Sequence, residues 1–400
     1  MSETVHIPQL RFPEFSGDWN RVKIQKLLDD KSIISHLDGN HGALYPRSEE
    51  FTKEGVPYVT ANDFINGKVD LKKCKCLPVE RASQFKKGIA HNGDVLFAHN
   101  ATVGPVALLE TDLEYVVLST TATYYRCDNN TLINKYLKVY LTSNDFVRQY
   151  SRVMSQSTRN QVPITTQRLF YINLPDKPEQ QKIAAFLTAV DSKIEQLSKK
   201  QELLGEYKKG AMQQIFSQAI RFKADDGSDF PDWKEKKLGD ILDYEQPTNY
   251  IVDSTEYDNS FDMPVLTAGK SFVLGYTNET HKVFENIPVI IFDDFTTANK
   301  YVDFPFKVKS SAMKILKPKD SFVNIRLIFE FIQMLNFPIG EHKRYWISEY
   351  QDLKIPFPSF EEQTKIANFL SSIDNKIEQV GKQLDESKQF KKALLQQMFV

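Results

Sequence analysis

One segment of about forty residues occurs twice in this 400-residue chain. The first copy contains EQQKIAAFLTAVDSKIEQL, from Glu179 to Leu197. The second contains EQTKIANFLSSIDNKIEQV, from Glu362 to Val380. We call the step along the chain from Glu179 to Glu362 the repeat offset. The chain must therefore accommodate the same long element twice, once in its middle and once near its end.

Both copies have the pattern of a long helix. Apolar residues recur at alternating steps of four and three, which is a heptad seam. Pro178 and Pro358 stand at the start of each copy, where proline opens a helix rather than breaking it. About forty residues at 1.5 Å each predict a rod of ~60 Å. The predicted seam residues are Ile183, Leu187, Val190, Ile194, Ile366, Leu370, Ile373 and Ile377. The narrow seam predicts that the two copies pack on each other as a helix pair; the alternative is that each helix packs only on its own globular domain.

The duplication extends beyond the helices. VPYVTA, from Val56 to Ala61, has a counterpart in MPVLTA, from Met263 to Ala268, and Trp19 has one in Trp233. Short β-type runs followed by helical stretches in each half predict an α+β class with pseudo-twofold symmetry. The predicted boundaries are a first globular domain at 1–175, a central helix at 176–217, a linker at 218–232, a second globular domain at 233–357 and a C-terminal helix at 358–400.

Composition limits the class of protein. A hydrophobic content of 41% with 26% charged residues is typical of a folded, soluble chain. No run of 18 apolar residues predicts a membrane span, and the N-terminus lacks a signal-peptide pattern. Three unpaired cysteines fit a reducing cytoplasm, which is the expected location. Cys74-x-Cys76 offers only half of a zinc site, so plain thiols are the better interpretation.

The sequence contains no recognisable set of catalytic residues. A Gly-rich loop ending in Gly-Lys-Ser/Thr is absent, and NLPD, from Asn173 to Asp176, lacks the second proline and the aromatic residue of an amino-methyltransferase motif. The acids at the start of the first helix are explained by the helix N-terminus. We therefore expect no catalytic residue, no metal and no cofactor in this chain.

The repeated helix and the domain before it resemble a known protein family. Glu-Gln-x-x-Ile-Ala-x-Phe-Leu followed by Asp-x-x-Ile-Glu, found twice and each time after an α+β domain, resembles the DNA-specificity subunit of Type I restriction-modification systems. The resemblance covers essentially the whole chain. It implies two target-recognition domains that each read one half of a bipartite double-stranded DNA site. It also implies that the two helices pack as an antiparallel coiled coil and dock two copies of a methyltransferase subunit. Restriction and translocase subunits would join that core. S-adenosylmethionine, Mg and ATP would belong only to the partner subunits.

Candidate DNA contacts follow from local charge, because the net charge of −1 is uninformative. From Phe146 to Pro175 there is no acid and there are four arginines. Hydroxyl, amide and guanidinium groups are those that contact phosphates and base edges. The candidates in the first domain are Thr60, Asn62, Asn100, Thr102, Arg152, Thr158, Arg159, Asn160 and Gln161, and those in the second are Thr267, Lys270, Asn299, Lys300, His342, Lys343, Arg344 and Tyr345.

Two other functions compete with this interpretation. One is a coiled-coil scaffold whose globular domains bind proteins rather than DNA. The other is a nuclease or methylase that acts alone. The sequence does not give the bases that would be recognised, because base readout depends on loop geometry.

Overall fold

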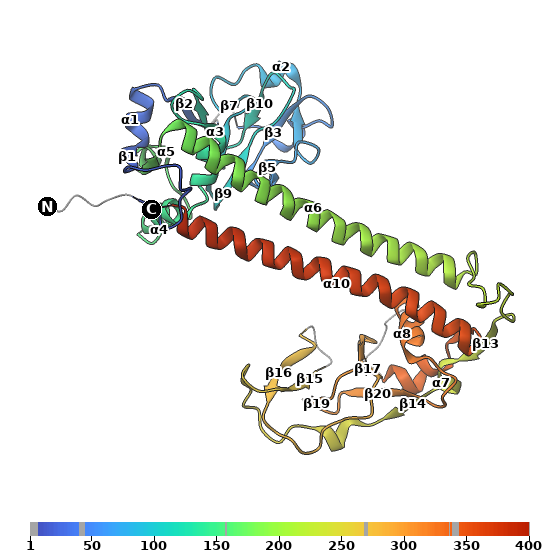
Figure 1. Ribbon diagram of the computed structural model, residues 1–400. Helices are drawn as coiled ribbons and strands as arrows, with labels where there is room; N and C mark the ends of the chain where they lie inside the picture. The colour runs from blue at the N-terminus through green and yellow to red at the C-terminus, as the bar shows by residue number, and fades with distance from the viewer. Residues whose placement is uncertain are drawn as a thin grey trace. The chain divides into compact units, whose positions relative to one another are not determined.

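The computed structural model describes residues 7–39, 45–156, 158–267, 271–335, 337 and 344–399. The chain divides into two compact units, and the first combines residues 1–200 with residues 380–400. The second unit contains residues 201–379. Each unit has its own sheets and helices (Figure 1), so the predicted α+β class is confirmed. No helix in the described part of the chain is long and apolar enough to cross a membrane.

The repeated segments form two long helices. Helix α6 spans Lys177–Phe216 and α10 spans Phe360–Gln397, drawn in green and red in Figure 1. The first part of α6 belongs to the first unit and its last part to the second unit, while α10 does the reverse. Proline is absent after the first turn of either helix, so the backbone hydrogen-bond ladder continues without a break.

The first unit is built around two mixed sheets. Their strand orders are β2-β11-β8-β9-β5-β4 and β6-β3-β10-β7, and β1 pairs with β12 separately. Strand β8 is buried from Val95 to His99, as expected for a central strand covered on both faces. The elements are β1 (Asn20–Lys23), α1 (Ile24–Asp29), β2 (Ile33–Asp38), η2 (Ser48–Glu50), β3 (Val56–Val59), η3 (Ala61–Asp63), β4 (Phe64–Ile65), β5 (Lys68–Val69), β6 (Lys75–Leu77), α2 (Val79–Ala82), β7 (Ile89–Ala90), β8 (Val95–Asn100), β9 (Thr102–Leu108), β10 (Val116–Leu118), β11 (Ala122–Cys127), α3 (Asn134–Tyr140), α4 (Asn144–Met154), α5 (Ile164–Gln167) and β12 (Tyr171–Leu174).

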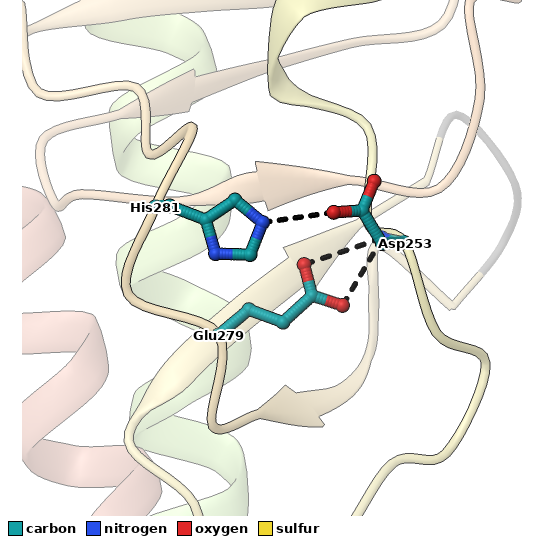
Figure 2. A group of neighbouring side chains, drawn as sticks. All are labelled: Asp253, Glu279 and His281. Atoms are coloured by element: carbon teal, nitrogen blue, oxygen red, sulfur yellow. Dashed lines mark hydrogen bonds and ion pairs between the residues drawn. The ribbon is translucent and has the colours of Figure 1, made fainter.

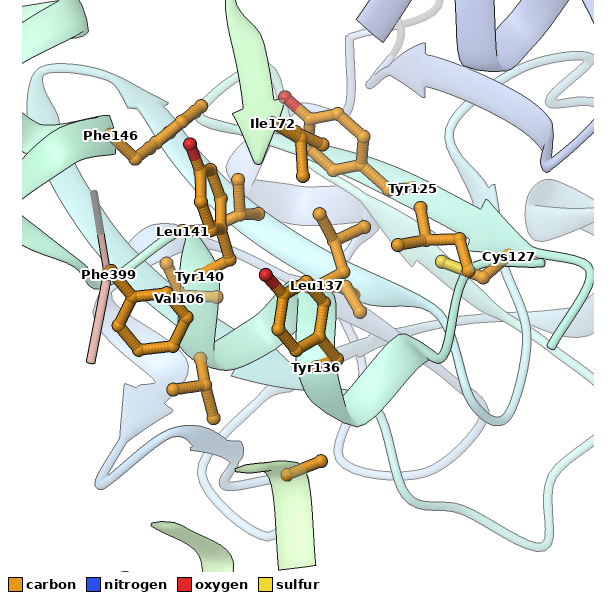
Figure 3. Close-up of a cluster of buried hydrophobic side chains, with 14 of the residues drawn as sticks. Val106, Tyr125, Cys127, Tyr136, Leu137, Tyr140, Leu141, Phe146, Ile172 and Phe399 are labelled. Atoms are coloured by element: carbon orange, nitrogen blue, oxygen red, sulfur yellow. The ribbon is translucent and has the colours of Figure 1, made fainter. Parts of the chain in front are cut away.

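The end of α10 completes the core of the first unit. Phe399 is 5% exposed, and its ring centroid lies 6.2 Å from that of Trp19. Tyr136 and Tyr140 approach the same ring at 6.1 and 5.8 Å, and Figure 3 shows both beside Phe399. Leu394 is buried in the same cluster. The first core is therefore assembled from residues at opposite ends of the sequence.

The second unit repeats this plan with fewer strands paired. Its sheets have the orders β14-β20-β17-β18 and β16-β15-β19, with β13 paired to β21. Its elements are β13 (Lys234–Lys237), α7 (Leu238–Ile241), β14 (Leu242–Glu245), η4 (Pro247–Tyr250), β15 (Met263–Leu266), β16 (Val273–Thr277), β17 (Val289–Asp293), β18 (Asn299–Val302), β19 (Lys307–Val308), β20 (Met313–Pro318), α8 (Ile325–Met334), α9 (Tyr345–Ser348), η5 (Tyr350–Asp352) and β21 (Lys354–Phe357). Met212 and Ile215, from the end of α6, are buried in its core beside the start of α10.

One buried glutamate ties the start of each long helix to its unit. Glu179 accepts a hydrogen bond from the Arg11 guanidinium at 2.7 Å and one from the Trp19 indole at 3.2 Å. Glu362, its equivalent in the second copy, accepts from Arg221 and Trp233, each at 2.8 Å. A carboxylate in the first turn also stabilises a helix through its dipole. The repeated Glu-Gln signature therefore fixes the base of each helix.

Ion pairs between the helices define their direction. The Lys391 ammonium lies 2.6 Å from the Asp191 carboxylate in the first unit, and the Lys208 ammonium lies 2.8 Å from Asp374 in the second. Moving forward along α6 from Asp191 to Lys208 therefore moves backward along α10 from Lys391 to Asp374. The helices are antiparallel, as predicted.

The predicted seam residues divide between two kinds of contact. Ile183 and Leu187 are buried in the first core together with the end of α10, and Ile366, Leu370 and Ile373 are buried in the second core together with the end of α6. The seam list is completed by Val190, Ile194 and Ile377, which are only partly buried. Both interpretations of the sequence thus hold in part, because each helix packs on its own domain and on its partner helix.

Candidate nucleic-acid interface

Residues far apart in the first half of the sequence meet at one surface. Asn100 and Thr102 flank the turn between β8 and β9, and Ala101 at its tip has a positive φ of 63°. The Asn160 side chain donates to the Ala101 carbonyl at 2.8 Å, and the Ala101 N–H donates to the Asn160 carbonyl at 3.0 Å. An isolated β-bridge joins Asn100 to Gln161. The structure therefore brings together candidates from two separate segments.

A loop that the sequence analysis missed joins a third candidate segment to this surface. The Thr121 hydroxyl accepts from the Ala61 N–H at 3.0 Å, between Thr60 and Asn62. The Thr121 carbonyl accepts from the His99 N–H, also at 3.0 Å. We call residues 119–121 the first hydroxyl loop. Three consecutive hydroxyl residues directly after the apolar strand VVL were the available signal.

A buried polar network holds the segment that contains Asn160 and Gln161. The Val162 N–H donates to the His99 carbonyl at 2.8 Å, and the Gln167 amide donates to the Val162 carbonyl at 2.9 Å. The Gln167 carbonyl oxygen accepts from Tyr125 at 2.7 Å and from His36 at 3.2 Å. Burial lowers the pKa of His36 to about 3, so its ring is neutral near pH 7. The buried hydrogen bonds of Val162 and Gln167 therefore hold the neighbouring residues Asn160 and Gln161 in place.

The second unit presents the same scaffold. The Tyr345 N–H donates to the Asp294 carbonyl at 2.8 Å, which matches the bond from Val162 to His99, and Val162 and Tyr345 are separated by the repeat offset. Likewise the Lys309 N–H donates to the Leu266 carbonyl at 2.8 Å, where the first unit pairs the Ser119 N–H with the Val59 carbonyl at the same distance. Val162 and Tyr345 therefore hold equivalent positions in the two units, which agrees with the repeat offset between them.

Ion pairing in the second unit replaces the glutamine network of the first. The Lys314 ammonium lies 3.3 Å from the Asp294 carboxylate, and both side chains are almost fully buried. Asp294 also accepts from the Trp346 N–H at 2.9 Å, which fixes the start of α9 directly after Arg344. A pocket of about 250 Å³ lies there, lined by Arg344, Lys314 and residues 310–312 among others. Arg344 is exposed at its edge.

The remaining candidates differ in exposure. The exposed ones are Asn62, Thr102, Arg152, Thr158, Arg159, Asn160, Lys300 and Arg344, and the half-buried ones are Thr60, Asn100, Gln161, Thr267 and Asn299. Thr60 has a local structural role, because its N–H and hydroxyl donate to Asp63 at 2.7 and 2.8 Å. Lys270, His342 and Lys343 lie outside the described residues.

Tyr345 requires a correction. Its side chain is 1% exposed and its ring packs on Phe337 with centroids 5.5 Å apart. The polar sequence before it suggested a loop residue, but its ring lies in the core and its N–H donates to the Asp294 carbonyl. In this conformation Tyr345 offers no side-chain contact to DNA.

One acidic cluster in the second unit has potential metal ligands. Figure 2 shows Asp253, Glu279 and His281 facing one another. The His281 ring lies 2.8 Å from Asp253, and the Lys282 ammonium lies 3.0 Å from the same carboxylate. These two contacts lower the pKa of Asp253 to about 2. Glu279 lies 2.7 Å from the buried Lys307 ammonium. Both carboxylates already form ion pairs with protein groups. We therefore interpret the cluster as a set of contacts that holds neighbouring loops together.

Two of the three cysteines are buried and Cys74 is partly buried. Burial raises the pKa of the Cys74 thiol to about 12, and Cys76 is buried. A zinc ligand must be a thiolate, so this environment disfavours metal binding. Within the described residues, the cysteines belong to no group of three or more potential ligands.

Known proteins are similar to this chain in sequence or in fold. The specificity subunit of the type I restriction enzyme EcoR124I/EcoR124II from Escherichia coli is 52% identical over 126 residues, which cover 30% of this chain and 31% of that subunit. The putative MjaX specificity subunit of Methanocaldococcus jannaschii is 24% identical, covering 96% of this chain and 93% of that one. The S subunit of a type I system from M. genitalium has the same fold, with a TM-score of 0.66 at 16% identity over 98% of this chain and 99% of that one.

A family model gives the assignment. The model described as the type I restriction modification DNA specificity domain matches residues 34–204 and 231–387. The two matches cover most of the chain, and each covers most of one of the globular scaffolds described above. The chain therefore belongs to the family of type I restriction-modification specificity subunits, which have two DNA-recognition domains and leave catalysis to partner subunits.

Proposed function

We propose that this chain reads a bipartite double-stranded DNA site, with one half-site for each recognition domain. The observation that supports this most is the repeated scaffold with different side chains on it. Equivalent backbone hydrogen bonds hold Asn160–Gln161 in one unit and Arg344 in the other at the same position of the scaffold. A common backbone keeps the approach to DNA the same, while the exposed side chains differ and can select different bases.

We further propose that the chain docks two copies of a methyltransferase subunit, to which restriction and translocase subunits attach. Each unit carries an equivalent apolar surface. In the second unit Phe222 and Phe369 pack with centroids 5.6 Å apart, beside the exposed Ile220 and Tyr207, and these residues line a pocket of about 560 Å³.

The first unit carries the counterpart of this surface. Phe12 and Phe186 pack with centroids 5.7 Å apart. Leu10 is 40% exposed, and Phe390, the counterpart of Tyr207 in the second copy of the repeat, is 53% exposed. Large exposed apolar side chains mark interaction sites more often than chance positions do. Two equivalent surfaces fit two copies of one partner.

Methylation profiling tests the DNA-reading proposal. The chain is co-expressed with a methyltransferase subunit of its family, and modified positions are mapped across the host genome. We expect one bipartite motif with an unspecified gap. Two outcomes would favour the scaffold alternative. One is modification of a continuous motif, and the other is modification of no specific motif while the globular domains bind proteins instead.

Native mass spectrometry tests the docking proposal. The wild-type chain should bind two methyltransferase copies. Tyr207→Ser and Phe390→Ser should each leave one copy bound, and the double variant none. Leu203→Ser is the matched control, because Leu203 is a comparably exposed apolar residue of α6 that does not line that pocket. Unchanged stoichiometry in the double variant would remove this surface from the interface.

A further inference from the structure

The first hydroxyl loop has a structural counterpart in the second unit. Strand β10 runs parallel to β3 and is followed by residues 119–121, while β19 runs parallel to β15 and is followed by residues 309–312. We call residues 309–312 the second hydroxyl loop. It is one residue longer, because the next strands begin at Ala122 and Met313. The two loops therefore leave the same place on the scaffold with different sequences.

In each loop one hydroxyl holds the loop in shape. The Thr121 hydroxyl accepts from the Ala61 N–H at 3.0 Å and lies 2.6 Å from the Ser119 hydroxyl. The Ser310 hydroxyl accepts from the Ala312 N–H at 3.4 Å. These two residues are supports, since their oxygens are already engaged.

A second hydroxyl in each loop remains available. Thr120 is half-buried and Ser311 is exposed, and neither hydroxyl has a hydrogen-bond partner in the described part of the chain. Thr120 adjoins the candidate Asn100, whose amide donates to the Thr120 carbonyl at 3.5 Å. Ser311 lines the pocket of about 250 Å³ together with Arg344. Each free hydroxyl thus lies among groups that we have proposed for the DNA-binding surface.

We propose that Thr120 and Ser311 are specificity-determining residues, which read base edges of the first and second half-site respectively. This inference rests on the proposed DNA-reading function. A hydroxyl both donates and accepts, so it can pair with several base edges, and its neighbours restrict the choice. Beside Ser311, the Arg344 guanidinium is suited to the O6 and N7 acceptors of guanine. In the first unit the neighbour is Asn100, which is bridged to Gln161, and amide side chains of this kind are suited to adenine.

Single-hydroxyl variants test the proposal in the complex with the methyltransferase subunit. Thr120→Val and Ser311→Ala each remove one hydroxyl with little change of volume, and methylation profiling reads both half-sites at once. Thr120→Val should relax one position of the first half-site by about tenfold in selectivity and leave the second unchanged. Ser311→Ala should do the opposite. Ser198→Ala, which removes an exposed hydroxyl from α6, is the control and should change neither.

The outcomes distinguish a failure of this inference from a failure of the proposed DNA-reading function. A wild-type complex that reads no bipartite site would overturn the proposed function. If the wild type reads such a site but both variants keep its two halves and its affinity, the inference fails. Thermal unfolding checks that the variants fold. Should Thr120→Val not fold, Thr120→Asn replaces it and is expected to change the preferred base, whereas an unchanged motif in that variant would equally refute the role.

Discussion

Asp191 of α6 and Lys391 of α10 form an ion pair of 2.6 Å, and the residues at the equivalent positions of the repeat, Asp374 and Lys208, form the same pair at 2.8 Å with the helices exchanged. In the second unit Glu330 and Arg326 join the pair. A heptad seam of apolar residues alone can slide by one repeat, whereas charged pairs on the seam favour one alignment. The two equivalent ion pairs therefore favour one alignment of the two helices.

Lys391→Met should lower the free energy of unfolding by about 1–2 kcal/mol, because Asp191 loses its nearest partner. The loss stays modest since Lys391 is 29% exposed and Lys138 lies 3.8 Å from the same carboxylate. Denaturant titration measures it, with the exposed neighbour Lys392→Met as control. Equal stability of the two variants would show that the pair contributes nothing.

Phe399→Ala should lower the free energy of unfolding by roughly 3 kcal/mol, because it removes a buried ring from the core of the first unit. Hydrogen exchange should show the loss in the first unit rather than the second. Phe390→Ala, on the exposed face of α10, is the matched control. A uniform loss of protection across both units would contradict the local role of this ring.

His36 should make the protein less stable in mild acid. Burial lowers the pKa of the folded-state ring to about 3, while the unfolded ring keeps a pKa near 6.5. Below pH 6.5 the unfolded state therefore binds a proton at this ring, whereas the folded state does not. The free energy of unfolding then falls by up to about 1.4 kcal/mol per pH unit down to pH 3. Above pH 6.5 this contribution is constant.

The measurement compares wild type with His36→Phe, a ring of similar size without a proton to bind. The difference in unfolding free energy between pH 7 and pH 5 should shrink in the variant. An identical pH dependence in both proteins would show that another group causes the acid sensitivity.

Arg159→Ala and Arg344→Ala should each weaken DNA binding by about 1–3 kcal/mol if the guanidinium contacts a base, with relaxed selectivity in one half-site only. A phosphate contact would instead weaken binding evenly across sequences and reduce the salt slope by about one unit. Titration of duplex DNA at several salt concentrations distinguishes the two. Unchanged affinity and slope in both variants would remove these arginines from the interface.

The long helices and the fold class could be predicted from the sequence because both rest on repetition and periodicity. Glu179 and Glu362 indicate equivalent helix starts, and the repeat offset puts Arg344 beside the counterpart of Asn160, in agreement with the backbone hydrogen bonds. These inferences need only the order of residues along the chain.

Other features depend on tertiary contacts that no local pattern reveals. Tyr345 is buried and its ring packs on Phe337, although the residues just before it in the sequence are polar. Thr121 lies in a β-type run of the sequence, and its role emerges only when Ala61 and His99 meet it in space. The heptad pattern likewise gives no sign that Ile183 is shared between a domain core and a partner helix.

The Leu10 N–H donates to the Gln397 carbonyl at 2.9 Å, and the Ile220 N–H donates to the Gln214 carbonyl at 3.2 Å. Gln214 and Gln397 are separated by the repeat offset, so these are one contact made twice. In the second unit a continuous linker runs from α6 through Ile220 into the domain, whereas in the first unit two distant stretches of chain meet at the same place without a covalent link. The order of helix end, entry segment and domain is therefore the same in both units, although only the second unit makes it with a continuous chain. A chain opened within 218–232 and joined at the other junction would pass through the same contacts in a rotated order.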